Sequence, residues 1–198
     1  MNNLDLQVIQ QGMAWLQAGH PVWLCSVICT YGSAPRGPGA MLVALADGQS
    51  RGSLSGGCVE EDFLERLGRQ AFSPVNQVVR YGEGGLTPSV TLPCGGVLDV
   101  LVEPFACDGQ ALEHFAMLLS AVQGHHALVR QVQLGTTQRS LETASGTGAV
   151  VEPGAQHVRI RVGAAQRVLV AGLSPVAEFC AGFAVSLGYE VIVCDPRR

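Results

Sequence analysis

The last 32 residues, 167–198, restrict the possible folds more than any other part of the chain. They run through an apolar strand ("RVLVAG"), a helix ("SPVAEFCAGFAVSLG") and a second apolar strand ("YEVIVCD"). Val176, Cys180, Phe183 and Leu187 recur on one face of this helix. Two strands joined by a helical crossover lie parallel in one sheet. The segment therefore predicts the opening of a Rossmann-like, dinucleotide-binding unit.

The nucleotide-binding signature of this unit is degenerate. Gly172, Ser174 and Ala177 occupy the positions of G-x-G-x-x-G/A, and Asp195 follows the second strand, where an acid that binds a ribose is expected. Ser174 replaces the glycine that lets the backbone approach a pyrophosphate. One nucleotide-binding half also needs three strands, and this segment supplies two. As it stands, the segment is not a complete NAD(P) site.

The rest of the chain predicts a larger α/β domain. Amphipathic helices are expected near residues 4–18, 58–71 and 109–123, each with one apolar face. Strands are expected at 22–30, 76–81, 97–105, 126–134 and 138–144, and residues 40–54 read as a hairpin that turns at Asp47 and Gly48. Residues 145–166, richer in glycine and polar groups, are predicted to link two units. We expect a mixed sheet with covering helices over 1–164 and a partial Rossmann-like unit over 165–198.

Composition excludes several classes of function. The net charge is −4 and no Lys/Arg block occurs, which argues against nucleic acid or an anionic membrane as partner. The N-terminal residues lack the basic start of a signal peptide, and no apolar run approaches the roughly 20 residues of a spanning helix. Seven cysteines without a CxxC predict neither a disulfide framework nor a metal site, so a reducing cytoplasm is expected. Cys25, Cys29, Cys180 and Cys194 are expected to be small buried hydrophobes, and Cys25 and Cys29, four apart in one strand, are expected on one face.

Three glycine-rich loops carry the residues suited to chemistry: "GSAPRGPG" (32–39), "SLSGGCVE" (53–60) and "LPCGG" (92–96). Each adjoins an apolar strand, so their tips are expected to gather at one edge of a sheet. Glycine-rich turns expose N–H groups that bind anions, and Arg36 adds a bidentate donor. Cys58 and Cys94 add soft thiols, which suit soft metals or sulfur transfer. Tight turns with cysteines that only pack are the alternative.

Cys58 is predicted to open a helix, because Val59, Phe63 and Leu67 follow at helical spacing. At a helix N-terminus the unpaired N–H groups and the macrodipole lower the pKa of a thiol. Burial has the opposite effect. The sequence therefore leaves two interpretations, a partly exposed acidified thiol or a small apolar plug.

At these loops the sequence resembles the xanthine dehydrogenase accessory factor family (XdhC/CoxI). The matching segments are "GSAPRGPGAMLV" (32–43), "GSLSGGCVEE" (52–61) and "LPCGGVLDVLVEP" (92–104). Residues 168–197 also resemble the start of that family's C-terminal Rossmann domain. The family usually has a Gly-x-Gly-His-like turn where this chain has "GLSPVA", and its members usually continue beyond "DPR".

The resemblance implies a maturation factor rather than an enzyme. Such proteins bind molybdenum cofactor (molybdopterin), help it acquire a terminal sulfido ligand, and insert it into an apo-dehydrogenase of the xanthine or CO dehydrogenase type. It further implies a cysteine desulfurase as partner and a homodimer. Carried over, Cys58 is the catalytic candidate, and the cofactor-binding candidates are Arg36, Ser55, Gly56, Gly57, Cys58, Glu60, Cys94, Gly95 and Gly96. No metal-ligand set is predicted.

Two other functions remain open at this stage. One is an NAD(P)-linked oxidoreductase that uses the C-terminal unit. The other is a non-catalytic scaffold that binds the dehydrogenase through its surface. Retention of cofactor on purification separates the maturation factor from the scaffold, and NAD(P) binding would favour the oxidoreductase.

Overall fold

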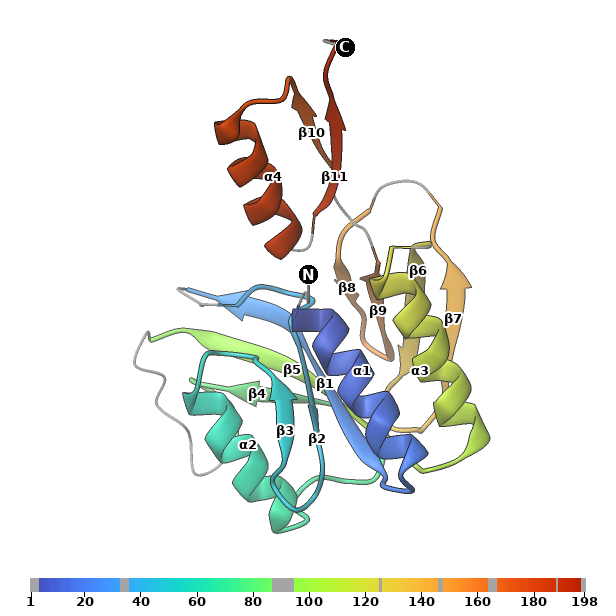
Figure 1. Cartoon of the computed structure of the whole chain (residues 1–198). Helices are drawn as coiled ribbons and strands as arrows, with labels where there is room; N and C mark the ends of the chain where they lie inside the picture. Colours follow the sequence, from blue (N-terminus) through green and yellow to red (C-terminus); the bar gives the residue numbers. More distant parts are fainter. Residues whose placement is uncertain are drawn as a thin grey trace.

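The computed structural model describes residues 4–32, 36–86, 95–124, 126–145, 148–163, 167–187 and 189–196 (Figure 1). The first three predicted helices are confirmed, and so is the strand–helix–strand order at the end. The helices are α1 (Leu4–Gln17), α2 (Cys58–Gly68), α3 (Gly109–Val122) and α4 (Pro175–Ser186). The strands of the first sheet are β1 (Val22–Tyr31), β2 (Met41–Ala44), β3 (Ser50–Gly52), β4 (Gln77–Tyr81) and β5 (Val97–Phe105). The remaining strands are β6 (Leu128–Gln133), β7 (Arg139–Thr143), β8 (Val151–Pro153), β9 (His157–Val162), β10 (Arg167–Ala171) and β11 (Glu190–Cys194).

The first sheet is antiparallel, with the strand order β3-β2-β1-β5-β4. Strands β1 and β5 pair over their whole length, from Val22 opposite Phe105 to Tyr31 opposite Val97. The hairpin expected at residues 40–54 is confirmed, because β2 and β3 pair across the turn that contains Asp47 and Gly48. This sheet positions all the loops that the sequence singled out.

The second sheet was not expected. It is antiparallel, in the order β7-β6-β9-β8, and two of its strands lie in the stretch predicted as a linker. Val158, Ile160 and Val162 alternate with polar residues and are buried, so β9 presents one apolar face, as a half-covered strand does. Polar residues at every second position lowered the hydrophobicity of the stretch and hid the strand. The prediction that residues 145–166 form a linker was wrong. The mixed sheet expected over residues 1–164 is instead two antiparallel sheets.

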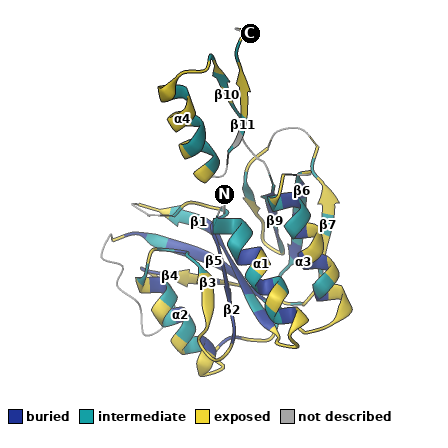
Figure 2. Ribbon diagram, in the orientation of Figure 1, coloured by how far each residue is buried: buried dark blue, intermediate teal, exposed yellow. Residues whose placement is uncertain are grey.

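Two apolar cores lie on opposite faces of the first sheet. On one face α2 packs Val59, Phe63 and Leu67 against the sheet. On the other face α1, α3 and the second sheet share one core, which includes Leu24 and Phe115. Figure 2 shows the buried residues concentrated along β1, β2 and β5, between these two layers. The first sheet is therefore covered on both sides.

A buried ion pair joins the two sheets. Arg130 of β6 contacts Glu103 of β5, and neither side chain is exposed. Arg139 of β7 lies 3.8 Å from the same carboxylate, and its guanidinium donates to Asn76 Oδ1 at 3.0 Å. A buried charge is strongly destabilising when its partner is removed. These contacts therefore fix the second sheet on the end of the first.

A β-bulge separates two cysteines that the sequence placed together. Cys25 pairs with Val102, but the register shifts between Val27 and Cys29, so that Cys29 pairs with Asp99. One extra residue moves the following side chains to the other face of the sheet. Cys25 is fully buried on the α2 side, whereas Cys29 is partly exposed on the opposite side. The prediction that both are buried on one face was wrong, because a bulge has no signature in strand periodicity.

This arrangement predicts different reactivities for the two thiols. We expect iodoacetamide to alkylate Cys29 in the native protein and to spare Cys25. Burial, with the nearby Glu103 carboxylate, raises the pKa of the Cys25 thiol, which keeps it protonated and shielded. Mass spectrometry of labelled peptides would check this. Equal labelling of the two cysteines under native conditions would contradict the bulge.

The C-terminal unit forms a separate small sheet. β10 and β11 are parallel, and α4 provides the crossover between them. None of the residues of α4 is buried, as the absence of dark blue in Figure 2 shows, and Phe179 and Phe183 are 70% and 68% exposed. Parallel sheets normally have both faces covered. Cys180 and Cys194 are exposed, so the prediction that they are buried was wrong. α4 buries none of its residues against the preceding domain, and we predict that this unit pairs with a second chain.

We expect the exposed face of α4 to drive self-association. Replacing both Phe179 and Phe183 with serine should abolish concentration-dependent association, because large exposed apolar patches mark interaction surfaces. The melting temperature should hardly change, since neither ring is buried in the single chain. Sedimentation velocity of this variant and of a Glu178→Ser control would test it. An unmodified chain that stays monomeric at all concentrations would contradict the prediction.

In the parts of the chain that the structure describes, no helix combines the length and the hydrophobicity needed to cross a bilayer.

Candidate functional site

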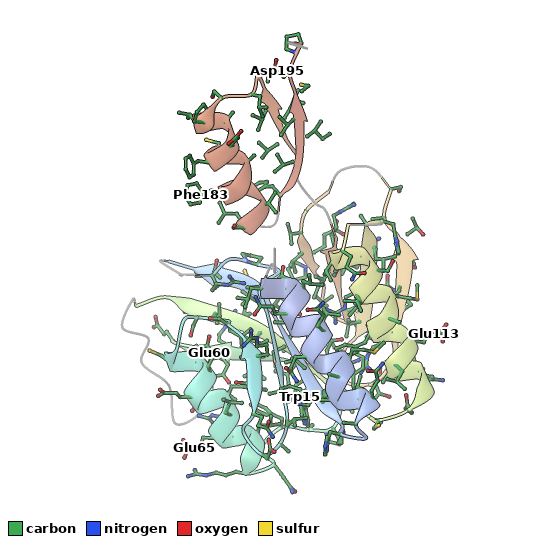
Figure 3. All side chains as sticks on the ribbon, viewed as in Figure 1. Trp15, Glu60, Glu65, Glu113, Phe183 and Asp195 are labelled. Atoms are coloured by element: carbon green, nitrogen blue, oxygen red, sulfur yellow. The ribbon has the colours of Figure 1, made fainter. Side chains whose placement is uncertain are left out.

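The loop before α2 is organised around one carboxylate, that of Glu60. Glu60 Oε1 accepts hydrogen bonds from four groups at 2.8–3.1 Å, and Oε2 accepts two more. The donors are the amides of Leu54, Ser55, Gly56 and Gly57 and the hydroxyls of Ser53 and Ser55. Figure 3 shows Glu60 at the start of α2. Glu60 therefore ties the loop to the first turn of the helix.

These bonds hold Glu60 ionised. Burial by itself raises the pKa of this carboxyl, but the hydrogen bonds from Ser55, Ser53 and Leu54 outweigh it and lower the pKa to about 2. The N–H groups that the sequence predicted to bind an anion thus already donate to the carboxylate of Glu60. Contact of Ser55, Gly56, Gly57 and Glu60 with a cofactor stays a prediction.

Cys58 is the first residue of α2 and is exposed. The preceding Gly57 has a φ of 147°, which side chains rarely adopt, and nothing lies within 4 Å of the position where its Cβ would be. The glycine is thus required by the backbone conformation, and the space beside it is open. The loop presents the Cys58 thiol to solvent, and the interpretation of Cys58 as a buried plug does not fit.

Two of the other glycine-rich loops meet at the end of the first sheet. A Cβ on Gly32 would lie 3.4 Å from the Cα of Gly96, and one on Gly82 would lie 2.6 Å from the carbonyl oxygen of Gly96. Figure 1 shows the start of α2 at the same end of the sheet as the start of β5. Gly32, after β1, and Gly96, before β5, therefore lie side by side, while residues 33–35 and 91–94 of these loops lie outside the described residues, and the gathering of the loop tips stays a prediction. Gly95 is exposed beside them, and Cys94 lies outside the described residues.

Arg36 lies on the α1 side of this region. Its guanidinium is 3.9 Å from the carboxylate of Asp5, and both side chains are about one-third exposed. Burial raises the pKa of Asp5, and the Arg36 charge opposes that shift. A salt bridge this long and this exposed contributes little to stability. The ion pair of Arg36 with Asp5 is therefore weak.

The sequence missed a polar cluster at the same end of the sheet. Arg80 donates to both carboxylate oxygens of Asp99, at 2.7 and 2.8 Å, and its guanidinium lies 5.8 Å from the ring centroid of Tyr31. A hydrogen bond with Cys29 is the main cause of a raised pKa of Tyr31, which is more than half exposed. Arg80 and Asp99 stand out as charges within apolar strands, but only the bulge brings Cys29 to them.

The nucleotide candidates form a turn whose amides are already bonded. Leu173 N donates to the carboxylate of Asp195, and Ala177 N donates to the hydroxyl of Ser174, which caps α4. Gly172 N donates to the Cys194 carbonyl at 2.7 Å. A pyrophosphate would need such amides free. Nucleotide binding by these four residues stays a prediction, and this geometry gives it no support.

Among the described residues, no three His, Cys, Asp or Glu side chains come together as a metal site.

The Glu60 network predicts a pH-dependent loss of stability. Glu60→Gln should lower the free energy of unfolding by about 2 kcal/mol at pH 7, because hydrogen bonds to a charged group are lost. A lowered pKa in the folded state stabilises above pH 4.5, the ordinary value for glutamate, and this contribution disappears as the pH falls towards 2. Urea unfolding should therefore show a smaller difference at pH 3 than at pH 7. The neighbouring exposed Glu61→Gln is the control, and equal stability of the two variants would refute the role of Glu60.

Three comparisons bear on this arrangement. The model of the XdhC and CoxI family matches residues 15–82. A molybdenum cofactor insertion chaperone of Escherichia coli K12, PaoD, is 38% identical over 85 residues, which are 41% of this chain and 26% of that protein. A crystal structure described as a xanthine dehydrogenase of Bacillus halodurans superposes with a TM-score of 0.63 at 20% identity, covering 98% of this chain and 62% of the other. That likeness shows a shared fold, and the chain spans only part of the length of both proteins. Residues 15–82 are thus similar to the XdhC and CoxI family, and the resemblance inferred from the motifs at 32–43 and 52–61 is confirmed.

Proposed function

We propose that this chain binds molybdenum cofactor and acts in the maturation of a molybdenum enzyme of the xanthine or CO dehydrogenase type. The observation that carries the proposal is the exposed Cys58 on a rigid, glycine-rich turn inside the segment that matches the XdhC and CoxI family. The similarity to a molybdenum cofactor insertion chaperone supports it. In this proposal the cofactor is cargo, and the chain is not an enzyme.

We assign different parts of the cofactor to different candidate residues. Because Glu60 occupies the amides of residues 54–57, a cofactor phosphate falls to other donors. Arg36, one-third exposed and only loosely held by Asp5, supplies a charged donor, with Gly95 and Gly96 on the same end of the sheet. Cys58, and Cys94 in the adjoining loop, supply soft sulfur ligands for molybdenum or its sulfido group. The residues present therefore fit such a cargo.

We further propose two partner proteins, a homodimer and a division of the chain into two domains. A cysteine desulfurase would supply the sulfur, the apo-dehydrogenase would accept the sulfurated cofactor, and the chain would work as a homodimer. Residues 1–164 would form the cofactor-handling domain, and residues 165–198 the start of a Rossmann-like unit. The exposed apolar face of α4 supports a dimer contact in this unit.

The experiment is the cofactor stoichiometry of the purified chain. We expect co-purified molybdenum and a fluorescent pterin with the unmodified chain, and at least a tenfold loss with Cys58→Ala. Arg36→Ala should weaken binding less, because it removes one phosphate contact. Cys180→Ala, an equally exposed thiol on α4, is the matched control. The thermal stability of Cys58→Ala should stay close to that of the unmodified chain, since the side chain is exposed.

The same measurements separate the alternatives. A chain that retains no cofactor but still binds the dehydrogenase would be a scaffold. A chain that binds NAD(P), with loss on Asp195→Ala, would favour the oxidoreductase. Either result would overturn the proposed function.

A further inference from the structure

One corner of the first sheet remains accessible on the face opposite α2. Val79 and Leu98 belong to the core under α2. Because neighbouring residues of a strand point to opposite faces, Arg80 of β4 and Asp99 of β5 lie on the other face, where they pair with each other. On that face α1 packs on β1, β2 and β3, and Tyr31 at the end of β1 is 53% exposed. This corner therefore presents polar side chains to solvent.

The bulge in β1 brings the Cys29 thiol to this corner. The register shifts between Val27 and Cys29, so that Cys29 pairs with Asp99. A regular strand would place the thiol in the apolar core on the α2 side, as it does for Cys25. Bulges are common next to active sites, where they redirect a side chain. A cysteine that only packs would not need this irregularity.

Tyr31, Arg80 and Asp99 accompany the Cys29 thiol. A hydrogen bond with Cys29 is the main cause of the raised pKa of Tyr31, so the Tyr31 hydroxyl stays protonated at neutral pH and donates to the sulfur. The Arg80 guanidinium lies 5.8 Å from the ring centroid of Tyr31 and donates to both carboxylate oxygens of Asp99, at 2.7 and 2.8 Å. A free phosphate would have to compete with this bidentate carboxylate for Arg80. The corner therefore does not suit an anion that is held by charge alone.

The nucleophile of this corner is the partly exposed Cys29 thiol. A thiolate attacks the sulfur of a disulfide or of a persulfide. A persulfide loses its proton more readily than a thiol, so the product of such an attack carries a negative charge at neutral pH. The Tyr31 hydroxyl and the nearby Arg80 guanidinium stabilise such an anion by hydrogen bonding and charge. The surroundings of Cys29 therefore suit a bound sulfur atom.

This thiol lies close to the proposed cofactor residues. Cys29 is three residues from Gly32, which lies beside Gly96. Three residues of a strand span about 10 Å. Cys58, at the start of α2, approaches the same end of the sheet from the other face. Cys29 is thus a second reactive thiol at this end, separate from the Cys58 turn.

We propose that Cys29 accepts a sulfane sulfur from a persulfide donor and holds it as a persulfide beside Tyr31 and Arg80. The Cys29 thiolate attacks the terminal sulfur of the donor R–S–SH, where R is the rest of the donor. A bond forms between Sγ and that sulfur, and the S–S bond of the donor breaks. The leaving thiolate R–S⁻ takes the proton of the new persulfide, so the products are R–SH and the Cys29 persulfide anion, with no net oxidation or reduction. That this sulfur becomes the sulfido ligand of the cofactor rests on the proposed function.

The test treats the full chain with glutathione persulfide at neutral pH, blocks the products with iodoacetamide and locates the added sulfur by mass spectrometry of fragmented peptides. We expect one added sulfur atom on Cys29 and none on the buried Cys25. Cys29 should react at least fivefold faster than Cys107, an exposed thiol that follows the opposite end of β5.

The matched variants separate a built site from an accessible thiol. Tyr31→Phe keeps the ring beside Arg80 and removes only the hydroxyl, so it should slow the labelling of Cys29 at least fivefold and leave that of Cys107 within twofold. Tyr189→Phe, which removes a hydroxyl from the C-terminal unit, should change neither rate. No added sulfur on Cys29, labelling of Cys29 no faster than that of Cys107, or an unchanged rate in Tyr31→Phe would overturn the proposal.

The labelling needs neither molybdenum cofactor nor dehydrogenase, so it is independent of the proposed function. A chain that retains no molybdenum but takes up sulfur on Cys29 would keep this proposal and refute the cofactor role. Cys29→Ser should still co-purify with molybdenum, because Cys29 only receives sulfur. Loss of molybdenum from this variant would make Cys29 a cofactor ligand and would overturn the assignment.

Discussion

The antiparallel pairing of β1 with β5 is the constraint on which the rest of the structure depends. These two inner strands belong to a sheet covered on both faces, and they carry residues of both apolar cores. One shared end brings Gly32 beside Gly96, and the other pairs Val22 with Phe105. A register slip of one residue would exchange the two cores and place the Glu103 carboxylate under α2, away from Arg130. The alternation of apolar residues and the buried ion pair therefore specify the same register.

Glu60 occupies the amides of the glycine-rich turn that could otherwise bind an external anion. A turn with several free amides would attract any small anion, including inorganic phosphate. In this chain Glu60 fills that position, and its pKa of about 2 keeps it charged at any physiological pH. The turn is consequently held in place without a ligand, and Cys58 lies at its end, at the exposed start of α2. Such preorganisation lowers the entropy lost when a ligand binds.

The sequence predicted the helices and the loops well, because their signals are local. Val59, Phe63 and Leu67 mark the buried face of α2, and the loop before α2 is marked by its glycines. The wrong predictions concern features that arise from pairing between segments far apart in the sequence. The bulge at Cys29 appears only when β1 is aligned with β5, and β9 becomes recognisable as a strand only beside β6. The role of Glu60 was visible in part, as an acid three residues after the Gly57 cap, but its bonds to four amides follow from the path of the whole loop.

The buried charges explain how the two sheets keep a fixed relation. Glu103 lies on β5 between Arg130 and Arg139, so the second sheet is joined directly to the strand that begins at Val97. Apolar contacts alone would allow two sheets to slide by small amounts, whereas a buried carboxylate with two guanidinium groups tolerates little displacement before a charge is left unpaired. The pairing is costly to bury and adds little net stability, but it restricts the geometry. Glu103 and the two arginines therefore fix the position of the second sheet on the first more than they add to the stability of the fold.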